Sequence, residues 1–229
     1  MIFKKTYEKY LKWQFFVPFG FKCDLDFHID LGSGDRIRNP FNAIRVAGSD
    51  YKLPTKQNLN SDFYVFDLTR EFPFESNSIS SFSAFDVLEH LPRWERTSDG
   101  DMKFTFINFM NEVNRCLVDG GYFFAVTPAF PSASAFQDPT HINFITEETI
   151  NYFAESSWAI NLDYEYSGNF RIIHQSWVYS NNVFYSFKEQ PNSIFIYYGV
   201  LTFNFVKILK NIYINRNRPT HLLWILQKT

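Results

Sequence analysis

Five short apolar runs, separated by segments with helical or turn-like patterns, constrain the fold more than any other feature of this chain. The runs cover residues 26–31, 43–48, 62–68, 81–88 and 122–127. Runs of this length that alternate with helical segments are typical of parallel strands joined by crossover helices. The pattern therefore predicts an α/β protein with an open, doubly wound sheet.

One crossover and the end of the sheet can be predicted in more detail. Residues 104–121 have the spacing of an amphipathic helix. Gly120 and Gly121 are expected to end it, because glycine tolerates the left-handed conformation at a helix C-terminus. After residue 160 the pattern changes, and residues 171–180 and 221–229 resemble strands at a mixed edge of the sheet.

The segment between these two strands is intensely apolar. Gly199, Asn204, Lys207 and Lys210 interrupt residues 194–214 within the roughly 20 residues that a membrane span requires. We predict a buried or partner-facing helix or hairpin here, with contact at a membrane surface as the alternative.

Length and composition limit the class of protein. A chain of 229 residues is long enough for one sizeable core, and we expect one domain, with residues 1–22 as a helical N-terminal extension and residues 181–218 as an apolar insertion before the last strand. The formal net charge of -2 argues against nucleic acid as a partner. Cys23 and Cys116 lack metal-ligand spacing. Near the N-terminus, Pro18 breaks a short apolar run, which makes this segment a poor signal peptide. We therefore expect a cytoplasmic protein.

The first apolar run leads into the sequence DLGSG at residues 30–34, which is a candidate ligand site. Small residues after a strand allow a sharp turn and a close approach of a ligand to the main chain. A dinucleotide fingerprint needs a third glycine at position 37, which is Ile37, so that form of the motif is absent. Two glycines alone do not specify a cofactor.

Acidic residues at the ends of the following runs strengthen this site. Asp50 follows the glycine turn by about 20 residues, the separation at which a carboxylate can hold ribose hydroxyls. Asp67 ends the third run, and Phe85 with Asp86 ends the fourth. Open α/β sheets bind ligands at the carboxyl ends of their strands, so the pattern predicts one site for a nucleoside.

Four blocks of the sequence form a recognisable series: HIDLGSGD, GSD, DFYVFDLTREFPFESNSISSFSAFDVLEHLPR and NEVNRCLVDGGYFFAVTPAFP. In this order they resemble the successive motifs of class I S-adenosylmethionine-dependent methyltransferases, over about residues 26–150. The resemblance implies a Rossmann-like, mostly parallel sheet of seven strands whose last strand is antiparallel. It also implies S-adenosylmethionine as the cofactor and S-adenosylhomocysteine as its product.

The resemblance assigns cofactor contacts to eight positions, and the chemistry of Arg36 adds a ninth candidate. The eight positions are Asp30, Gly32, Gly34, Asp50, Asp67, Leu68, Phe85 and Asp86. Asp30, Gly32 and Gly34 are expected to line the methionine and ribose part of the cofactor, and Asp50 is expected to hold the ribose hydroxyls. The alternative for Asp30 is a structural role, in which its carboxylate bonds backbone amides of the turn.

The remaining positions of this set lie at the ends of the third and fourth runs and in the turn. Asp67 with Leu68 is expected to border the adenine, and Phe85 with Asp86 to close the site. A strand-end cap is the alternative for Asp67, and ordinary core packing is the alternative for Phe85. Arg36 stands where the family pattern has glycine, so it could instead bind the carboxylate of the cofactor through a charge-assisted hydrogen bond.

Methyl transfer to a hydroxyl also needs a group that accepts the proton, and histidine is the usual choice near neutral pH. His141 is our main candidate, because it lies in a loop just after the fifth run, with Asp138 close enough to orient its imidazole. Its alternative is a loop histidine bonded to the backbone. His90 is the second candidate, with structural support of its loop as the alternative. No spacing gives a convincing set of metal ligands, so no metal is predicted.

The blocks GSGDRIRNPFNA and QDPTHINFIT further resemble methyltransferases associated with bacterial surface-polysaccharide assembly. This resemblance implies O-methylation of a sugar hydroxyl on lipopolysaccharide or capsular glycan. The aromatic-rich C-terminal part is consistent with a sugar-stacking surface or a glycosyltransferase partner, and equally with core packing. Peripheral contact with the inner face of the membrane is a further expectation. The alternatives are methyl transfer to a small metabolite, a lipid or a protein side chain, and a non-catalytic scaffold with the same fold.

Overall fold

A computed structural model of the chain describes residues 26–55, 62–154, 158–178 and 219–229. The chain divides into two units, Met1–Lys22 with Tyr179–Pro219, and Cys23–Val178 with Thr220–Thr229. The second unit contains all the helices and strands of the described residues. The expected N-terminal extension 1–22 and the apolar insertion 181–218, with its 194–214 segment, lie outside the described residues.

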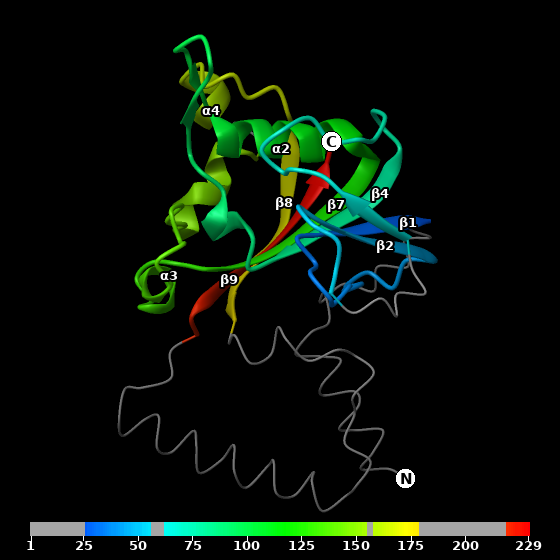
Figure 1. Ribbon diagram of the computed structural model, residues 1–229. Helices are drawn as coiled ribbons and strands as arrows, with labels where there is room; N and C mark the ends of the chain where they lie inside the picture. Colours follow the sequence, from blue (N-terminus) through cyan, green and yellow to red (C-terminus); the bar gives the residue numbers. More distant parts are fainter. Residues whose placement is uncertain (1–25, 56–61, 155–157, 179–218) are drawn as a thin grey trace, which may run out of the picture. The chain divides into compact units, whose positions relative to one another are not determined.

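A seven-stranded sheet with the order β3-β2-β1-β4-β7-β9-β8 forms the centre of the second unit (Figure 1). Its strands are β1 (Phe27–Leu31), β2 (Arg45–Asp50), β3 (Asp62–Val65), β4 (Ile79–Phe85), β7 (Leu117–Pro128), β8 (Phe170–Val178) and β9 (His221–Lys228). The neighbours from β3 to β7 pair in parallel, whereas β9 pairs antiparallel with β7 and β8. The predicted mostly parallel α/β sheet with an antiparallel last strand is therefore confirmed.

The strand order places the candidate site. From β1 the chain builds outward through β2 to β3, then returns to the other side of β1 and adds β4 and β7. Parallel pairing brings the carboxyl ends of these five strands to one edge of the sheet. The order in which strands are added to the sheet therefore reverses between β1 and β4, and open α/β sheets bind their ligands at such a position.

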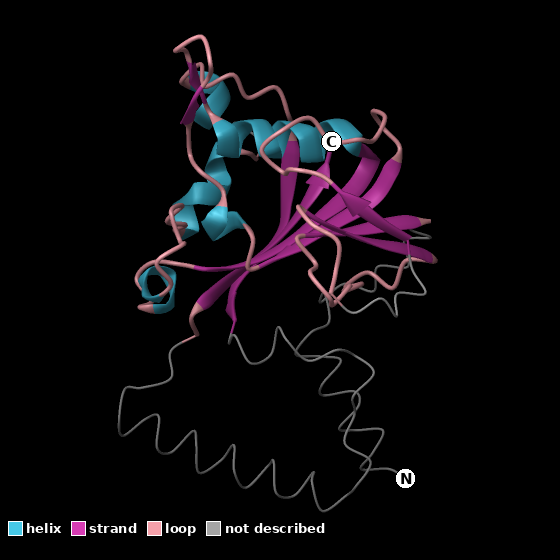
Figure 2. Cartoon of the chain, in the orientation of Figure 1, coloured by secondary structure: helices cyan, strands magenta, loops and turns pink. Residues whose placement is uncertain are grey.

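Helix α2 (Thr105–Cys116) packs across one face of the sheet (Figure 2). Its buried side chains Phe109 and Val113 join a core with Leu31, Phe82 and Phe123 from the strands. Full burial of such a side chain contributes roughly 1.5–3 kcal/mol, so this apolar layer supports the strands whose ends carry the site.

The other described elements are short. They are η1 (Leu88–His90), the hairpin of β5 (Glu95–Arg96) and β6 (Met102–Lys103), α3 (Ser134–Gln137), η2 (Glu147–Tyr152) and α4 (Trp158–Asn161). Within the described ranges, no helix is both long and apolar enough to cross a membrane.

The predicted end of the helix over 104–121 is wrong. Helix α2 ends at Cys116, because Leu117 is extended, with φ of -64° and ψ of 141°. Leu117 is fully buried and pairs with Ile79 of β4, so the pairing with β4 begins before the glycines. Gly120 and Gly121 lie within β7 instead.

Crossover helices are the general expectation between parallel strands, but residues 32–44, which connect β1 and β2, form turns and loops. Side chains bond the backbone of this segment instead. Asp30 Oδ2 accepts the Arg38 N–H at 2.8 Å, and the Asn39 side chain bonds both the N–H and the carbonyl of Ala43. Pro40 adds a residue without an N–H, which does not favour a helix interior.

Candidate active site

The glycine turn lies at the carboxyl end of β1. Gly32 and Gly34 have φ of 64° and 54°, in the left-handed region that favours glycine. A Cβ atom on Gly32 would lie 2.6 Å from Val87 Cγ2, whereas a Cβ atom on Gly34 would meet no atom within 4 Å. The Gly34 side of the turn is therefore open, which fits a ligand that passes close to the main chain.

Asp50, the last residue of β2, contacts this turn. Its Oδ2 accepts the Gly34 N–H at 3.1 Å, and its Oδ1 accepts the Tyr51 N–H at 2.7 Å. Beside it, the Ser33 N–H donates to the Ser49 carbonyl at 2.9 Å and holds the turn against β2. A carboxylate has about four acceptor positions, so Asp50 retains capacity to accept ribose hydroxyls.

Asp67 and Leu68 follow β3 at the same edge of the sheet. Asp67 is exposed, and its Oδ1 accepts both the N–H and the hydroxyl of Thr69 at 2.8 Å. Leu68 is half-buried against the core. The bonds from Thr69 to Asp67 are those of a strand-end turn, which is the structural alternative for this residue.

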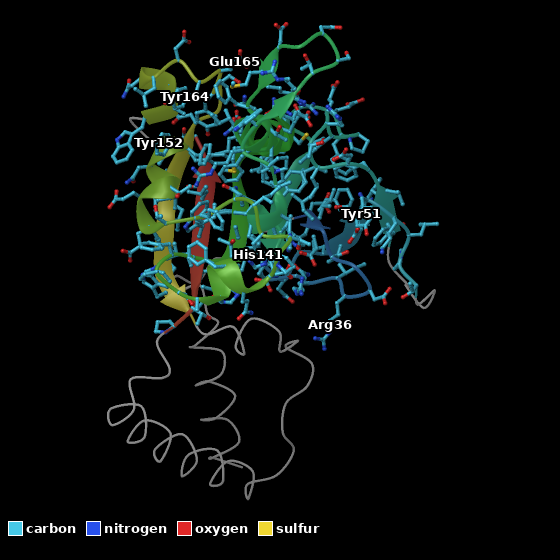
Figure 3. All side chains as sticks on the ribbon, turned by 60° about the vertical axis from the view of Figure 1, so that its left-hand side comes forward. Arg36, Tyr51, His141, Tyr152, Tyr164 and Glu165 are labelled. Carbon is cyan, nitrogen blue, oxygen red and sulfur yellow. The ribbon has the colours of Figure 1, made fainter. Side chains whose placement is uncertain are left out.

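Phe85 lies in the core and Arg36 lies at the surface. Phe85 is buried, with the Arg38 guanidinium carbon 4.6 Å from its ring centroid and the Phe124 ring at 5.3 Å. Arg36 is exposed, and its side chain extends away from the sheet (Figure 3).

Asp30 belongs to a buried polar network between β1 and β4. Its Oδ1 accepts the Ser83 hydroxyl at 2.6 Å, and Ser83 Oγ lies 2.9 Å from His28 Nε2. His28 Nδ1 lies 2.8 Å from Ser81 Oγ. Burial raises the pKa of Asp30 to about 7 and lowers the pKa of His28 to about 3. The backbone bond from Arg38 to Asp30 matches the structural alternative for this acid.

A second cluster lies where η1 meets the loop after β7, and sequence reasoning missed its central residue. Glu89 is 1% exposed, and its Oε2 accepts the Thr127 hydroxyl at 2.9 Å. Its Oε1 has no hydrogen-bond partner and lies 3.9 Å from His141 Nε2. Burial, with the neighbouring charge of Asp86, raises the pKa of Glu89 to about 8. The signal was present in the LEH sequence, where only the histidine drew attention.

The two candidate histidines meet beside Glu89. Their rings are edge-to-face, with centroids 4.9 Å apart. His141 Nδ1 lies 3.2 Å from the Ala135 carbonyl, and His90 Nδ1 lies 3.3 Å from the Thr140 carbonyl. A carbonyl oxygen only accepts, so both Nδ1 atoms carry the hydrogen when the rings are neutral, and both Nε2 atoms carry a lone pair.

Asp138 acts on this cluster through Thr140. Its Oδ1 accepts the Thr140 N–H at 2.8 Å and the Thr140 hydroxyl at 2.7 Å, and these bonds hold the pKa of Asp138 below its usual value. Thr140 Oγ1 in turn lies 3.1 Å from His90 Nδ1. The carbonyl of Asp138 accepts the His141 N–H, while the His141 ring is oriented by Ala135.

A further acid–histidine pair joins the ends of β4 and β9. Asp86, with φ of 54°, places Oδ1 3.2 Å from His221 Nε2, and His221 Nδ1 lies 2.7 Å from Thr220 Oγ1. His221 pairs with Pro128 across the antiparallel ladder. Sequence reasoning placed His221 in a strand but had no signal for its contact, because the register of β9 decides it.

Comparison with solved structures agrees with the fold. An S-adenosylmethionine-dependent methyltransferase from Archaeoglobus fulgidus has a TM-score of 0.51 and 14% identity, over 98% of this chain and 94% of that chain. The cyclase SpnF has a TM-score of 0.49 and 14% identity over 97% and 80% of the two chains. A methyltransferase from Mesorhizobium loti has a TM-score of 0.48 and 13% identity over 95% and 98%. No protein-family model and no curated protein sequence matches the chain.

Proposed function

We propose that this protein is an S-adenosylmethionine-dependent methyltransferase. The observation that carries the proposal is the open glycine turn of β1, whose Gly34 N–H donates to the Asp50 carboxylate of the adjacent parallel strand at 3.1 Å. The turn offers main-chain atoms to a ligand, and Asp50 offers acceptors to a ribose. When bound, the cofactor supplies a methyl group on a sulfonium, and the chain's task is to orient the acceptor and exclude water.

We propose a hydroxyl of a bacterial surface polysaccharide as the methyl acceptor. Two sequence blocks support this acceptor, because those around the glycine turn and His141 resemble methyltransferases associated with surface-polysaccharide assembly. Exposed rings near His141 also support it, because Phe136 stacks on Phe144 at 4.8 Å and Phe130 adds an edge contact, and aromatic faces suit the apolar side of a sugar. A glycosyltransferase partner at the membrane surface remains part of this proposal.

His141, His90 and Asp138 are proposed to serve this acceptor. The two imidazoles come from different segments, and each has a ring nitrogen within 4.8 Å of a Glu89 carboxylate oxygen. Asp138 acts as a positioning residue, because it bonds Thr140 and Thr140 contacts His90.

Isothermal titration of the full chain tests the cofactor. S-adenosylmethionine and S-adenosylhomocysteine should bind with one site, and Asp50→Asn should weaken both at least tenfold because it removes the charge that faces the ribose. Asp119→Asn is the matched control, because this aspartate has an 87% exposed side chain near the start of β7. The absence of binding by the folded wild type would reject the proposed function.

Transfer of a labelled methyl group tests the acceptor. The protein and labelled cofactor are incubated separately with delipidated surface oligosaccharides, membrane lipids, unmodified proteins and a small-molecule extract. Label in the oligosaccharide fraction supports the sugar proposal. Label in another fraction keeps the methyltransferase and replaces its substrate class, and no label in any fraction with cofactor bound favours a non-catalytic role.

A further inference from the structure

We propose that Glu89, His90 and His141 bind a divalent transition-metal ion. Each residue offers one ligand atom, and the three atoms lie within 4.8 Å of one another. Two ligand atoms on opposite sides of one ion lie about 4.2 Å apart, because each metal–ligand bond is about 2.1 Å long. The three side chains can therefore reach a common ion through shifts of less than about 1 Å.

The buried carboxylate oxygen is the observation that points to a ligand. Glu89 is 1% exposed, its Oε1 has no hydrogen-bond donor among the described residues, and His141 Nε2 lies 3.9 Å from it. Buried oxygens are normally satisfied, because an unpaired one costs about 1–3 kcal/mol. An ion between Oε1 and the imidazoles would provide this oxygen with a partner.

The hydrogen bonds behind the cluster are those that metal-binding histidines commonly have. His141 Nδ1 faces the Ala135 carbonyl and His90 Nδ1 faces the Thr140 carbonyl, so both Nε2 atoms are left as lone-pair donors. Glu89 Oε2 is held by the Thr127 hydroxyl, which leaves Oε1 for the ion. Outer bonds of this kind fix the tautomer and the orientation of metal ligands.

The donor set selects the class of metal. Two imidazoles and one carboxylate suit zinc, iron or another first-row transition ion, whereas magnesium and calcium prefer oxygen ligands. Three protein ligands also leave a coordination position open, as in catalytic sites.

The role of the open position rests on the proposed function. An acceptor hydroxyl bound there would release its proton to solvent at a lower pH than a free hydroxyl. Its oxygen would then form a bond to the methyl carbon while the carbon–sulfur bond breaks and its electron pair stays on sulfur. In this assignment His141 holds the ion and does not take the proton itself.

Metal titration of the untagged, chelator-treated full chain tests the site. Zn²⁺ should bind with one site per chain and at least tenfold more tightly than Mg²⁺. Glu89→Gln, His90→Gln and His141→Gln should each weaken Zn²⁺ at least tenfold, and Asp138→Asn should weaken it less. His174→Gln is the control, because this histidine of β8 contacts Ser176.

The outcomes separate this proposal from the proposed function. Circular dichroism verifies that each variant is folded, and His90→Gln, at an exposed position, provides a test if the buried variants do not fold. Absence of Zn²⁺ binding, or binding that none of the three substitutions weakens, would overturn the metal site. Zn²⁺ binding without cofactor binding would retain the site and reject the methyltransferase.

Discussion

Two buried carboxyl groups at the carboxyl edge of the sheet differ in how the chain satisfies them. Asp30 at the end of β1 is 0% exposed and Glu89 in η1 is 1% exposed, and burial raises the pKa of both. Asp30 accepts the Ser83 hydroxyl on one oxygen and the Arg38 N–H on the other. Glu89 accepts the Thr127 hydroxyl on Oε2, and its Oε1 receives no hydrogen bond.

The charges around the two groups also differ. The Arg38 guanidinium lies 3.9 Å from Asp30 Oδ2 and favours its charged form. The neighbours that act on Glu89 include Asp86 and Asp138, whose charges disfavour its ionisation. The first carboxyl group therefore completes a structural network, whereas the second has one oxygen that forms no hydrogen bond with the described residues.

The largest expected loss of stability at neutral pH is that of Asp30→Ala. This substitution removes the acceptor of the Ser83 hydroxyl and of the Arg38 N–H, and the loss of these buried bonds should lower the free energy of unfolding by about 3 kcal/mol. Urea denaturation measures the change. Asp119→Ala at an exposed site should change stability by less than about 0.5 kcal/mol. A loss below about 1 kcal/mol for Asp30→Ala would contradict its structural role.

The glycine turn lies between Asp30 and the segment that leads to Glu89, and the space where Gly32 would carry a Cβ atom is filled by Val87. Gly32→Ala should cost about 2 kcal/mol, since its Cβ would lie 2.6 Å from Val87 Cγ2 at a φ of +64°. Gly34→Ala has no such neighbour and should cost about 1 kcal/mol for its left-handed backbone alone. Thermal unfolding of the two variants measures the difference, and equal losses would show that the contact with Val87 does not limit this position.

The dependence of stability on pH tests the Asp30 network. Asp30 has a pKa of about 7 in the fold, so it keeps a proton that the unfolded chain releases, and its contribution to stability rises as the pH falls from 7 towards 4. His28 has a pKa of about 3, so the unfolded chain takes up a proton below pH 6.5 that the fold does not. The contribution of His28 to stability therefore falls as the pH falls. Between about pH 4 and 6.5 the two contributions oppose each other.

Asp30→Asn should therefore uncover the contribution of His28. Its free energy of unfolding should fall by up to about 1.4 kcal/mol per pH unit between pH 6.5 and 4, relative to the wild type. His28→Gln is the mirror control and should become more stable, relative to the wild type, over the same range. Urea denaturation across this range gives both slopes, and profiles parallel to that of the wild type would show that neither pKa is displaced.

The smallest expected change in stability is that of Glu89→Gln in the absence of metal. The glutamine amide keeps an acceptor for the Thr127 hydroxyl and adds donors that can face His141 Nε2, so stability should change by less than about 1 kcal/mol. Urea denaturation in the presence of a chelator measures it. A loss above about 2 kcal/mol would show that Glu89 is as structural as Asp30 and would remove the contrast between the two groups.

Much of the fold was predictable because apolar runs and glycines act locally. The runs located the strands, and the family blocks implied the antiparallel last strand that β9 forms. The boundaries of connections were less accurate, because pairing of Leu117 with Ile79 ended α2 early and the bond from Arg38 to Asp30 replaced a helix. Both are contacts between residues far apart in the sequence or on different elements.

The sequence by itself determined where strands and turns follow one another along the chain, and which acids and glycines lie at the strand ends. It could do so because hydrophobic periodicity and backbone freedom depend on neighbouring residues. Only the tertiary structure decided the contacts of Glu89 with Thr127 and His141 and of Asp86 with His221. These groups lie on separate strands and loops, so the register of the sheet and the course of the loop after β7 bring them together. Burial there also raises the pKa of Glu89, through the loss of water around its carboxyl group.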